Sequence, residues 1–106
     1  MGIWALRTVN GDAVPAVLSD DGTTQVSIRQ ALLFVDAGGG CIINATYVTT
    51  TNGTPREEEV PLVCGWEQSG SQVAIAWPGG EMSGMLTDTF LTLTDDDGHE
   101  YVYERT

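Results

Sequence analysis

The chain contains no lysine, one histidine and two cysteines among its 106 residues. Four arginines stand against fifteen acidic residues, which gives a formal net charge of −11 at pH 7. Such a surface repels phosphate backbones and anionic lipid headgroups, so we expect neither nucleic-acid binding nor attachment to a membrane surface. An acidic shell that keeps a small protein soluble explains this charge, and a cationic partner is the alternative.

Long apolar runs are also missing. No stretch reaches the roughly 20 apolar residues that a membrane-spanning helix requires, so we expect no membrane insertion. The opening residues, MGIWALRTVNG, lack the basic segment followed by an apolar segment that marks a secretory signal. Localisation therefore has to be inferred from other features.

Helical periodicity is absent too, and short alternating segments separated by turns take its place. No window carries apolar residues at i, i+3, i+4 and i+7 over three turns, whereas thirteen glycines punctuate the chain. A chain of this length is about one domain, so we assign residues 1–106 to a single domain. The expected strands cover residues 3–10, 14–20, 26–36, 41–50, 56–68, 72–78, 81–86, 89–95 and 100–105.

The connections between these strands are short, which predicts antiparallel neighbours. A two-residue turn at Asn52-Gly53 pairs Tyr47 with Glu58 and Cys41 with Cys64. The same Asn52-Gly53-Thr54 also matches a glycan acceptor. Further turns are expected at residues 69–70, 79–80, 87–88 and 96–98, and they predict the pairs Trp66–Val73, Ile75–Cys64, Trp77–Met82, Met82–Leu93, Leu93–Tyr101 and Leu91–Tyr103.

This register places apolar side chains on one face of each strand. A one-residue slip would reverse every face, so the agreement across successive turns supports the register. An antiparallel meander with one apolar face most simply closes on itself, which predicts an all-β up-and-down barrel of eight or nine strands. The expected interior comprises Trp4, Leu6, Leu32, Phe34, Cys41, Ile43, Val60, Leu62, Cys64, Trp66, Val73, Ile75, Trp77, Met82, Leu86, Leu91, Leu93, Tyr101 and Tyr103.

Two segments of the chain resemble small bacterial lipocalin-like domains. GIWALRTVNGDAVPAVL resembles their opening, and GWEQSGSQVAIAWPGGEMSGMLTDTFLTLTDDDGHEYVYER resembles their closing strands. The resemblance implies a lipocalin-like barrel that is found in exported or cell-envelope proteins and has no agreed catalytic motif. The chain departs from the family at REEEVPLVCGW, where the family carries a long hairpin rich in threonine and serine, so ligand or partner preferences do not transfer.

The two cysteines are directly opposed in the expected register, with both side chains pointing inward. Opposed residues in a hydrogen-bonded pair have Cα atoms about 5.5 Å apart, which suits a disulfide. Two free thiols acting as small apolar residues are the alternative. We expect the Cys41–Cys64 disulfide, and with it an exported protein in the periplasm, the cell envelope or the extracellular space, its signal segment absent from this chain.

The polar motifs give no catalytic or metal constellation. His99 is expected to be exposed in a turn, with no nucleophile motif around it. The segment TDDDGHE at residues 94–100 lacks calcium-loop spacing, so we read it as a turn, with weak cation binding as the alternative. Glu57, Glu58 and Glu59 alternate faces along one strand, with Arg56 as their expected surface partner. We therefore expect no enzyme, no cofactor and no bound metal.

A barrel of eight strands is just wide enough to be filled by its own side chains or to hold one small ligand. We expect a binding module with a small apolar ligand inside the barrel or a protein partner at its rim. The alternative is a structural, self-associating barrel whose core is filled by its own side chains. An unfilled space beside Gly84 would favour the ligand-binding function over this alternative. The expected ligand-binding residues are Trp4, Phe34, Trp66, Trp77, Tyr101 and Tyr103. The expected self-association residues are Leu33, Val35, Ile42, Val48 and Phe90.

Overall fold

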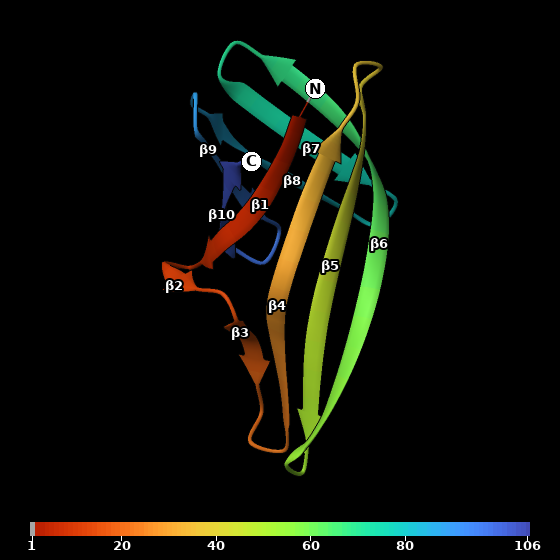
Figure 1. The fold of residues 1–106 in the computed structure, drawn as a ribbon, viewed down its shortest axis with the longest axis vertical. Coiled ribbons are helices and arrows are strands. Elements are labelled where there is room, and N and C mark those ends of the chain that lie inside the picture. The colour runs from red at the N-terminus through yellow and green to blue at the C-terminus, as the bar shows by residue number, and fades with distance from the viewer. Residues whose placement is uncertain (1) are drawn as a thin grey trace.

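The computed structural model describes residues 2–106, which form one antiparallel sheet of ten strands (Figure 1). No helix in this part of the chain is long and apolar enough to cross a membrane. The strands are β1 (Gly2–Val9), β2 (Asp12–Ala13), β3 (Ala16–Asp20), β4 (Thr24–Val35), β5 (Gly40–Thr51), β6 (Thr54–Ser69), β7 (Gln72–Trp77), β8 (Gly80–Leu86), β9 (Phe90–Asp95) and β10 (Glu100–Arg105).

The sheet closes because β1 pairs on one side with β10 and on the other with β4. Eight strands, β1 and β4 to β10, thus form a closed antiparallel barrel, and the short strands β2 and β3 add to β1 and β4. Apart from these two additions, neighbours in the sheet follow the chain order. The expected up-and-down barrel is confirmed.

Three strands extend beyond the closed part of the barrel. β4, β5 and β6 contain 12, 12 and 16 residues, and with β3 they continue past the barrel as a ribbon, which extends downward in Figure 1. The molecule is accordingly elongated, with extents of 45 × 25 × 24 Å. Val60 lies on the inner face of this ribbon and is 38% exposed, so its expected place in the core is wrong.

The β5–β6 register agrees with the sequence prediction throughout. Tyr47 pairs with Glu58 and Cys41 pairs with Cys64. Asn52 and Gly53 adopt φ values of 51° and 80°, as a tight hairpin turn with two left-handed residues requires. The cysteines form a disulfide across this hairpin, with Cα atoms 4.9 Å apart, as expected.

The next three hairpins are displaced from the predicted register by two residues. Trp66 pairs with Ile75 rather than Val73, Ile75 pairs with Met82, and Met82 pairs with Asp95. The turns lie at residues 70–71, 78–79 and 88–89, each one position from its expected place. Turn chemistry explains the first two of these displacements. Gly70 at the first central position suits a type II′ turn, and Pro78-Gly79 suits a type II turn. A shift of two residues keeps the same side chains inside. The β9–β10 register is as predicted.

Strand β4 has the opposite phase from the one predicted. Leu33 and Val35 are buried, whereas Leu32 and Phe34 are 38% and 37% exposed. The β4–β5 connection decides this, because Asp36 pairs with Gly40 around a three-residue loop and Val35 then faces Cys41. Four consecutive apolar residues left either phase open in the sequence. The assignments of Leu32 and Phe34 to the interior, and of Leu33 and Val35 to the surface, are therefore wrong.

The core fills most of the barrel. Leu33, Ile75, Leu91 and Leu93 are fully covered at its centre. Gly84 was expected to mark an unfilled space if a ligand binds, but a Cβ there would lie only 1.6 Å from the carbonyl oxygen of Thr92. Glycine at this position permits close approach of β8 to β9 and leaves no room for a ligand.

Candidate functional site

A cavity of about 210 Å³ lies inside the barrel, at the end where β9 turns into β10. Its wall draws on β4 to β10, so the barrel strands rather than the loops form it, and it is partly open to solvent. The lining residues are Ile28, Ala31, Ile43, Ala45, Tyr47, Leu62, Trp77, Met82, Asp95, Tyr101 and Tyr103.

Small side chains on two neighbouring strands help to leave this space open. Ala31 on β4 and Ala45 on β5 are direct cross-strand partners, and both are buried on the inner face. Facing side chains normally fill the inside of a barrel of this size. Because alanine fills little of it, the wall is recessed where the two alanines meet.

Aromatic side chains form much of the remaining wall. Tyr47 comes from β5, Trp77 from the end of β7, and Tyr101 and Tyr103 from β10. Tyr101 and Tyr103 are two residues apart on one strand, so alternation directs both to the same face. The cavity is thus bounded by four aromatic rings drawn from three strands.

The tyrosine hydroxyls provide polar groups within this apolar wall. Burial is the main cause that raises the pKa of Tyr103, and burial also raises the pKa of Tyr47. Both phenols therefore stay protonated at neutral pH. Of the three lining tyrosines, only Tyr101 has a side-chain hydrogen-bond partner within residues 2–106. Tyr103 is only 2% exposed as a whole, but its hydroxyl oxygen is not fully covered and can hydrogen-bond a molecule in the cavity.

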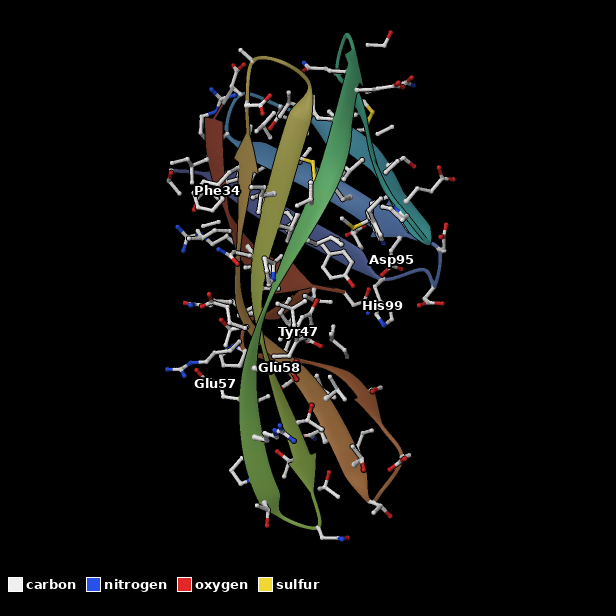
Figure 2. All side chains as sticks on the ribbon, turned by 90° about the vertical axis from the view of Figure 1, so that its right-hand side faces the viewer. Phe34, Tyr47, Glu57, Glu58, Asp95 and His99 are labelled. Carbon is white, nitrogen blue, oxygen red and sulfur yellow. A yellow bond between two sulfur atoms is a disulfide. The ribbon has the colours of Figure 1, made fainter. Side chains whose placement is uncertain are left out.

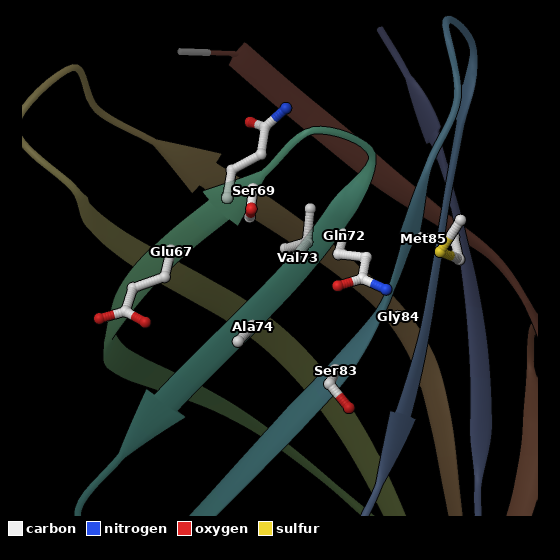
Figure 3. Close-up of a pocket in the computed structure, with 9 residues that line it drawn as sticks. Glu67, Ser69, Gln72, Val73, Ala74, Ser83, Gly84 and Met85 are labelled. Atoms are coloured by element: carbon white, nitrogen blue, oxygen red, sulfur yellow. The ribbon is translucent and has the colours of Figure 1, made fainter.

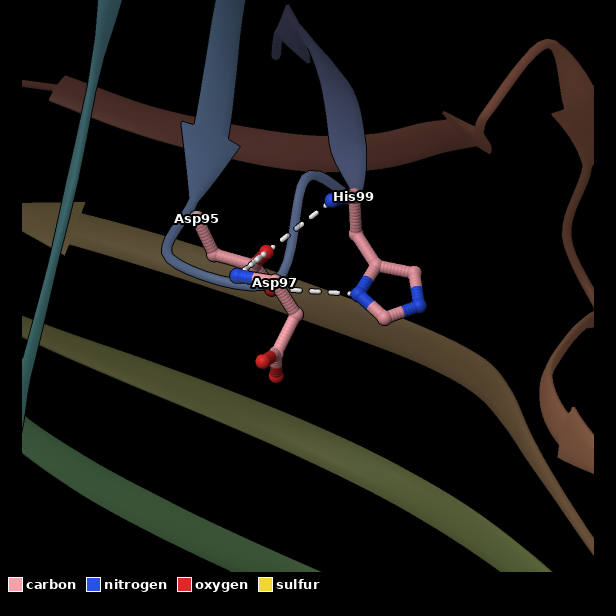
Figure 4. A group of neighbouring side chains, drawn as sticks. All are labelled: Asp95, Asp97 and His99. Carbon is pink, nitrogen blue, oxygen red and sulfur yellow. Dashed lines mark hydrogen bonds and ion pairs between the residues drawn. The ribbon is translucent and has the colours of Figure 1, made fainter.

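Asp95 is the one acidic side chain of the lining. One of its oxygens, Oδ1, accepts hydrogen bonds from the backbone N–H groups of Asp97 and His99, both at 3.0 Å (Figure 4). The other oxygen, Oδ2, accepts a hydrogen bond from the Tyr101 hydroxyl at 2.9 Å. Partial desolvation raises the pKa of Asp95, but these hydrogen bonds outweigh it and leave the pKa below its ordinary value. The carboxylate is consequently ionised at neutral pH.

His99 is less exposed than expected. Its side chain is 26% exposed, and its Nδ1 lies 3.5 Å from Oδ2 of Asp95. That Nδ1 is covered and has no hydrogen-bond partner within the described residues. The expectation of an exposed turn histidine is wrong, because the β9–β10 turn folds its side chain toward Asp95. Figure 2 shows Asp95 and His99 on the flank of the barrel above the ribbon.

Asp95, Asp97 and His99 each offer a potential metal-ligand atom within 4.8 Å of the other two. The hydrogen bonds to Asp95 already account for their grouping, since that carboxylate closes the β9–β10 turn. Asp97 is exposed, and Figure 4 shows its carboxylate directed away from the other two side chains. We therefore assign the group to the structure of the turn.

The residues predicted to bind a ligand divide into three groups. Trp77, Tyr101 and Tyr103 do line the cavity. Trp4 is buried beneath Arg105, whose guanidinium carbon lies 4.6 Å from the centroid of its ring, and Trp66 packs against the core outside the cavity lining. As described above, Phe34 lies on the outer surface and is excluded from the interior.

Sequence reasoning did not place five of the lining residues in the interior: Ile28, Ala31, Ala45, Tyr47 and Asp95. Tyr47 and Asp95 are the two of these with polar side chains. Tyr47 shares the phase of Cys41 and Ile43 on β5, so strict alternation carried a signal for it. Asp95 stands in an acidic run that reads as a solvated turn, and nothing in that run shows which carboxylate faces inward.

The acidic segment of β6 does not line the cavity. Glu57 forms an ion pair with Arg29 of β4 at 2.6 Å, rather than with the expected Arg56. Both side chains are more than half exposed, so the pair adds little stability. Glu58 lies opposite Tyr47 and therefore on the same face of the sheet (Figure 2).

A larger hollow of about 790 Å³ lies on the outer face of β6, β7 and β8 (Figure 3). Glu67 is its only charged lining residue, and no aromatic residue contributes to it. Figure 3 shows the side chains spread over the strands rather than converging on one point. The interior cavity is more recessed and brings aromatic and polar groups from several strands to one space, and we treat it as the candidate site.

The outer surface also carries an apolar row, made of Ile3, Phe34, Ile42 and Val63. These are successive cross-strand partners on β1, β4, β5 and β6. Their exposed fractions range from 37% to 72%.

Of the residues expected to mediate self-association, only some lie on the surface. Ile42 and Phe90 are 43% and 44% exposed, and Val48 is partly exposed. Leu33 and Val35 belong to the core instead.

The chain matches no family model, no curated protein and no solved structure.

Proposed function

We propose that this protein is a non-catalytic binding module that holds one small ligand in the interior cavity. The observation that carries the proposal is the hydroxyl of Tyr103, which belongs to a side chain only 2% exposed in the wall of this aromatic-lined cavity and has no hydrogen-bond partner within residues 2–106, although its oxygen is not fully covered. A phenolic hydroxyl can both donate and accept a hydrogen bond, so it can bind a polar group of a molecule in the cavity. A ligand with an apolar body and one polar group would fill the space and satisfy the hydroxyl.

The geometry around Asp95 supports binding rather than catalysis. The hydroxyl hydrogen-bonded to this carboxylate belongs to Tyr101, and burial, followed by the hydrogen bond to Asp95, raises the pKa of Tyr101 far above its ordinary value. A phenol held in its protonated form is a poor nucleophile. Asp95 and His99 therefore do not activate a nucleophile in this arrangement.

The disulfide supports an oxidising compartment for this module. Cys41 and Cys64 join two strands of the barrel wall, and such bonds persist mainly in exported proteins. We propose that the chain functions outside the cytoplasm as a lipocalin-like carrier or sensor of its ligand.

The experiment is to fill the cavity and follow binding. Ala45→Leu adds a large side chain to the cavity wall, whereas Ala76→Leu makes the same change on the exposed face of β7. Saturation-transfer NMR with the one-ring probes benzyl alcohol and benzylammonium should detect binding to the wild type and Ala76→Leu, and none to Ala45→Leu.

Thermal melting of both variants shows whether each one is folded at the temperature of the NMR experiment. The proposal fails if neither probe binds the wild type at millimolar concentration, or if folded Ala45→Leu binds them equally well.

Self-association through the apolar row is a second candidate function, with another copy of the chain as the partner. The row contains no charged side chain although the chain carries a net charge of −11, so two copies could meet there without opposing carboxylates. Light scattering should show a dimer that Ile42→Thr converts to monomer. Phe90→Thr, which changes an exposed aromatic outside the row, should leave the dimer intact. A monomeric wild type at high micromolar concentration would exclude this function.

A further inference from the structure

The interior cavity has the chemistry of a site for a positively charged molecule. We propose that its ligand is a small organic ammonium ion, with a body no larger than one ring and a short substituent. This inference rests on the proposed function and adds the class of ligand.

The volume limits the ligand to a few heavy atoms. The cavity measures about 210 Å³. Benzene occupies an engineered protein cavity of about 150 Å³. One six-membered ring with a short polar substituent therefore matches the volume of this cavity.

The charge of the lining excludes anions. Asp95 is the only residue of the lining that is ionised at neutral pH, and none of the four arginines contributes to the wall. Glu58 adds a second negative charge beside Tyr47 on the same face. The overall charge of −11 further concentrates cations around the molecule. A bound carboxylate or phosphate would meet uncompensated repulsion, whereas an ammonium ion would be attracted.

The aromatic wall adds attraction for a cation. Tyr47, Trp77, Tyr101 and Tyr103 surround the same space. A cation over such rings gains about 0.5–1 kcal/mol when exposed and about 2 kcal/mol when desolvated. An aromatic lining with an ionised carboxylate thus favours a cation over a neutral molecule of equal shape.

The tyrosine oxygens can accept hydrogen bonds from an ammonium ion. The Tyr101 hydroxyl donates its hydrogen to Asp95, so the lone pairs on its oxygen remain to accept. The hydroxyls of Tyr47 and Tyr103 have lone pairs as well. An ammonium N–H group can donate to any of these oxygens, including that of Tyr103, which has no hydrogen-bond partner within the described residues.

The test uses probes of nearly equal size that differ in charge. Benzylammonium, benzyl alcohol and benzoate are titrated at pH 7 into the wild-type protein by isothermal calorimetry. We expect benzylammonium to bind about tenfold more tightly than benzyl alcohol, a difference of about 1.4 kcal/mol. Benzoate should show no binding. Raising the salt concentration should weaken only the benzylammonium complex, because its attraction is partly Coulombic.

Asp95→Asn removes the charge with little change of shape and should reduce the tenfold preference to threefold or less. Asp36→Asn is the matched control, because Oδ1 of Asp36 also accepts two backbone hydrogen bonds in a turn, from Gly38 and Gly40, but lies outside the cavity. This variant should keep the full preference. Thermal melting shows whether both variants are folded.

The outcomes separate the two proposals. If benzyl alcohol binds the wild type as tightly as benzylammonium, or if salt has no effect, the charge inference is overturned while the binding function stands. If none of the three probes binds, the binding function itself is overturned.

Discussion

Replacing Gly84 with alanine should destabilise the barrel more than a one-methyl change in a strand ordinarily does. The added Cβ would lie 1.6 Å from the Thr92 carbonyl oxygen and 2.7 Å from its carbon. Both atoms belong to the backbone of β9, so no side-chain rotation can relieve the contact. To reach even 3.0 Å, β8 and β9 would have to separate by about 1.4 Å.

The cost follows from that separation. A ladder hydrogen bond of about 2.9 Å is lost when it lengthens by more than about 1 Å. Two such bonds contribute about 1 kcal/mol each, and overpacking adds about 1–3 kcal/mol. We therefore expect Gly84→Ala to lower the free energy of unfolding by about 3–5 kcal/mol, a large share of the stability of a small domain.

Urea denaturation followed by tryptophan fluorescence measures this loss. Gly65→Ala is the matched control, because a Cβ at Gly65 would lie 3.8 Å from its nearest neighbour, the carbonyl oxygen of Ala76. That variant should stay within about 1 kcal/mol of the wild type or gain stability, since alanine restricts the unfolded chain. A Gly84→Ala protein within 1 kcal/mol of the wild type would refute the reasoning, as would equal losses in both variants.

Three further predictions concern stability. Replacing Cys41 and Cys64 together with alanine should cost about 3 kcal/mol in urea denaturation, because the bond closes a loop between residues 23 apart; an unchanged midpoint would contradict this. Asn52→Ala should cost about 1–2 kcal/mol, since Asn52 has a φ of 51°, and a neutral result would argue against the left-handed turn. The lowered pKa of Asp95 implies stability that is complete above its unfolded pKa of about 3.9 and lost as pH falls through the folded value. Wild-type unfolding free energy should therefore fall more steeply than that of Asp95→Asn below pH 4, and parallel pH profiles would contradict the assignment.

The sequence predicted the barrel because turn chemistry and alternation reinforce each other along most of the chain. Asn52-Gly53 admits one placement of its turn, and the register around it was right. Each of the turns at Gly70 and Gly79 can be placed at two positions one residue apart. The prediction placed them at residues 69–70 and 79–80, whereas the structure has them at residues 70–71 and 78–79. The error preserved the inward face, so most of the core was still identified.

Strand β4 shows where local pattern fails. Leu32, Leu33, Phe34 and Val35 are all apolar, so alternation cannot choose between the two phases. The choice depends on the length of the β4–β5 loop, which the run of glycines leaves open. This single cause explains why Leu32 and Phe34 were wrongly assigned to the interior and why Leu33 and Val35 were wrongly assigned to the surface.

The candidate site was predictable only in part. Trp77, Tyr101 and Tyr103 were expected inside from the strand phases, and they do line one cavity. The recess between Ala31 and Ala45 depends on a cross-strand pair that the sequence analysis did not assign. The inward turn of Asp95 depends on backbone N–H groups and on Tyr101 beyond the turn, so composition alone gave no sign of it.

The central claim is that the barrel interior binds a small cation. A crystal structure of the wild-type protein soaked with benzylammonium tests it most directly. The account predicts density for the ring among Tyr47, Trp77 and Tyr103, with the nitrogen toward Asp95. A cavity filled by repacked side chains, or a probe found only on the outer face, would contradict it.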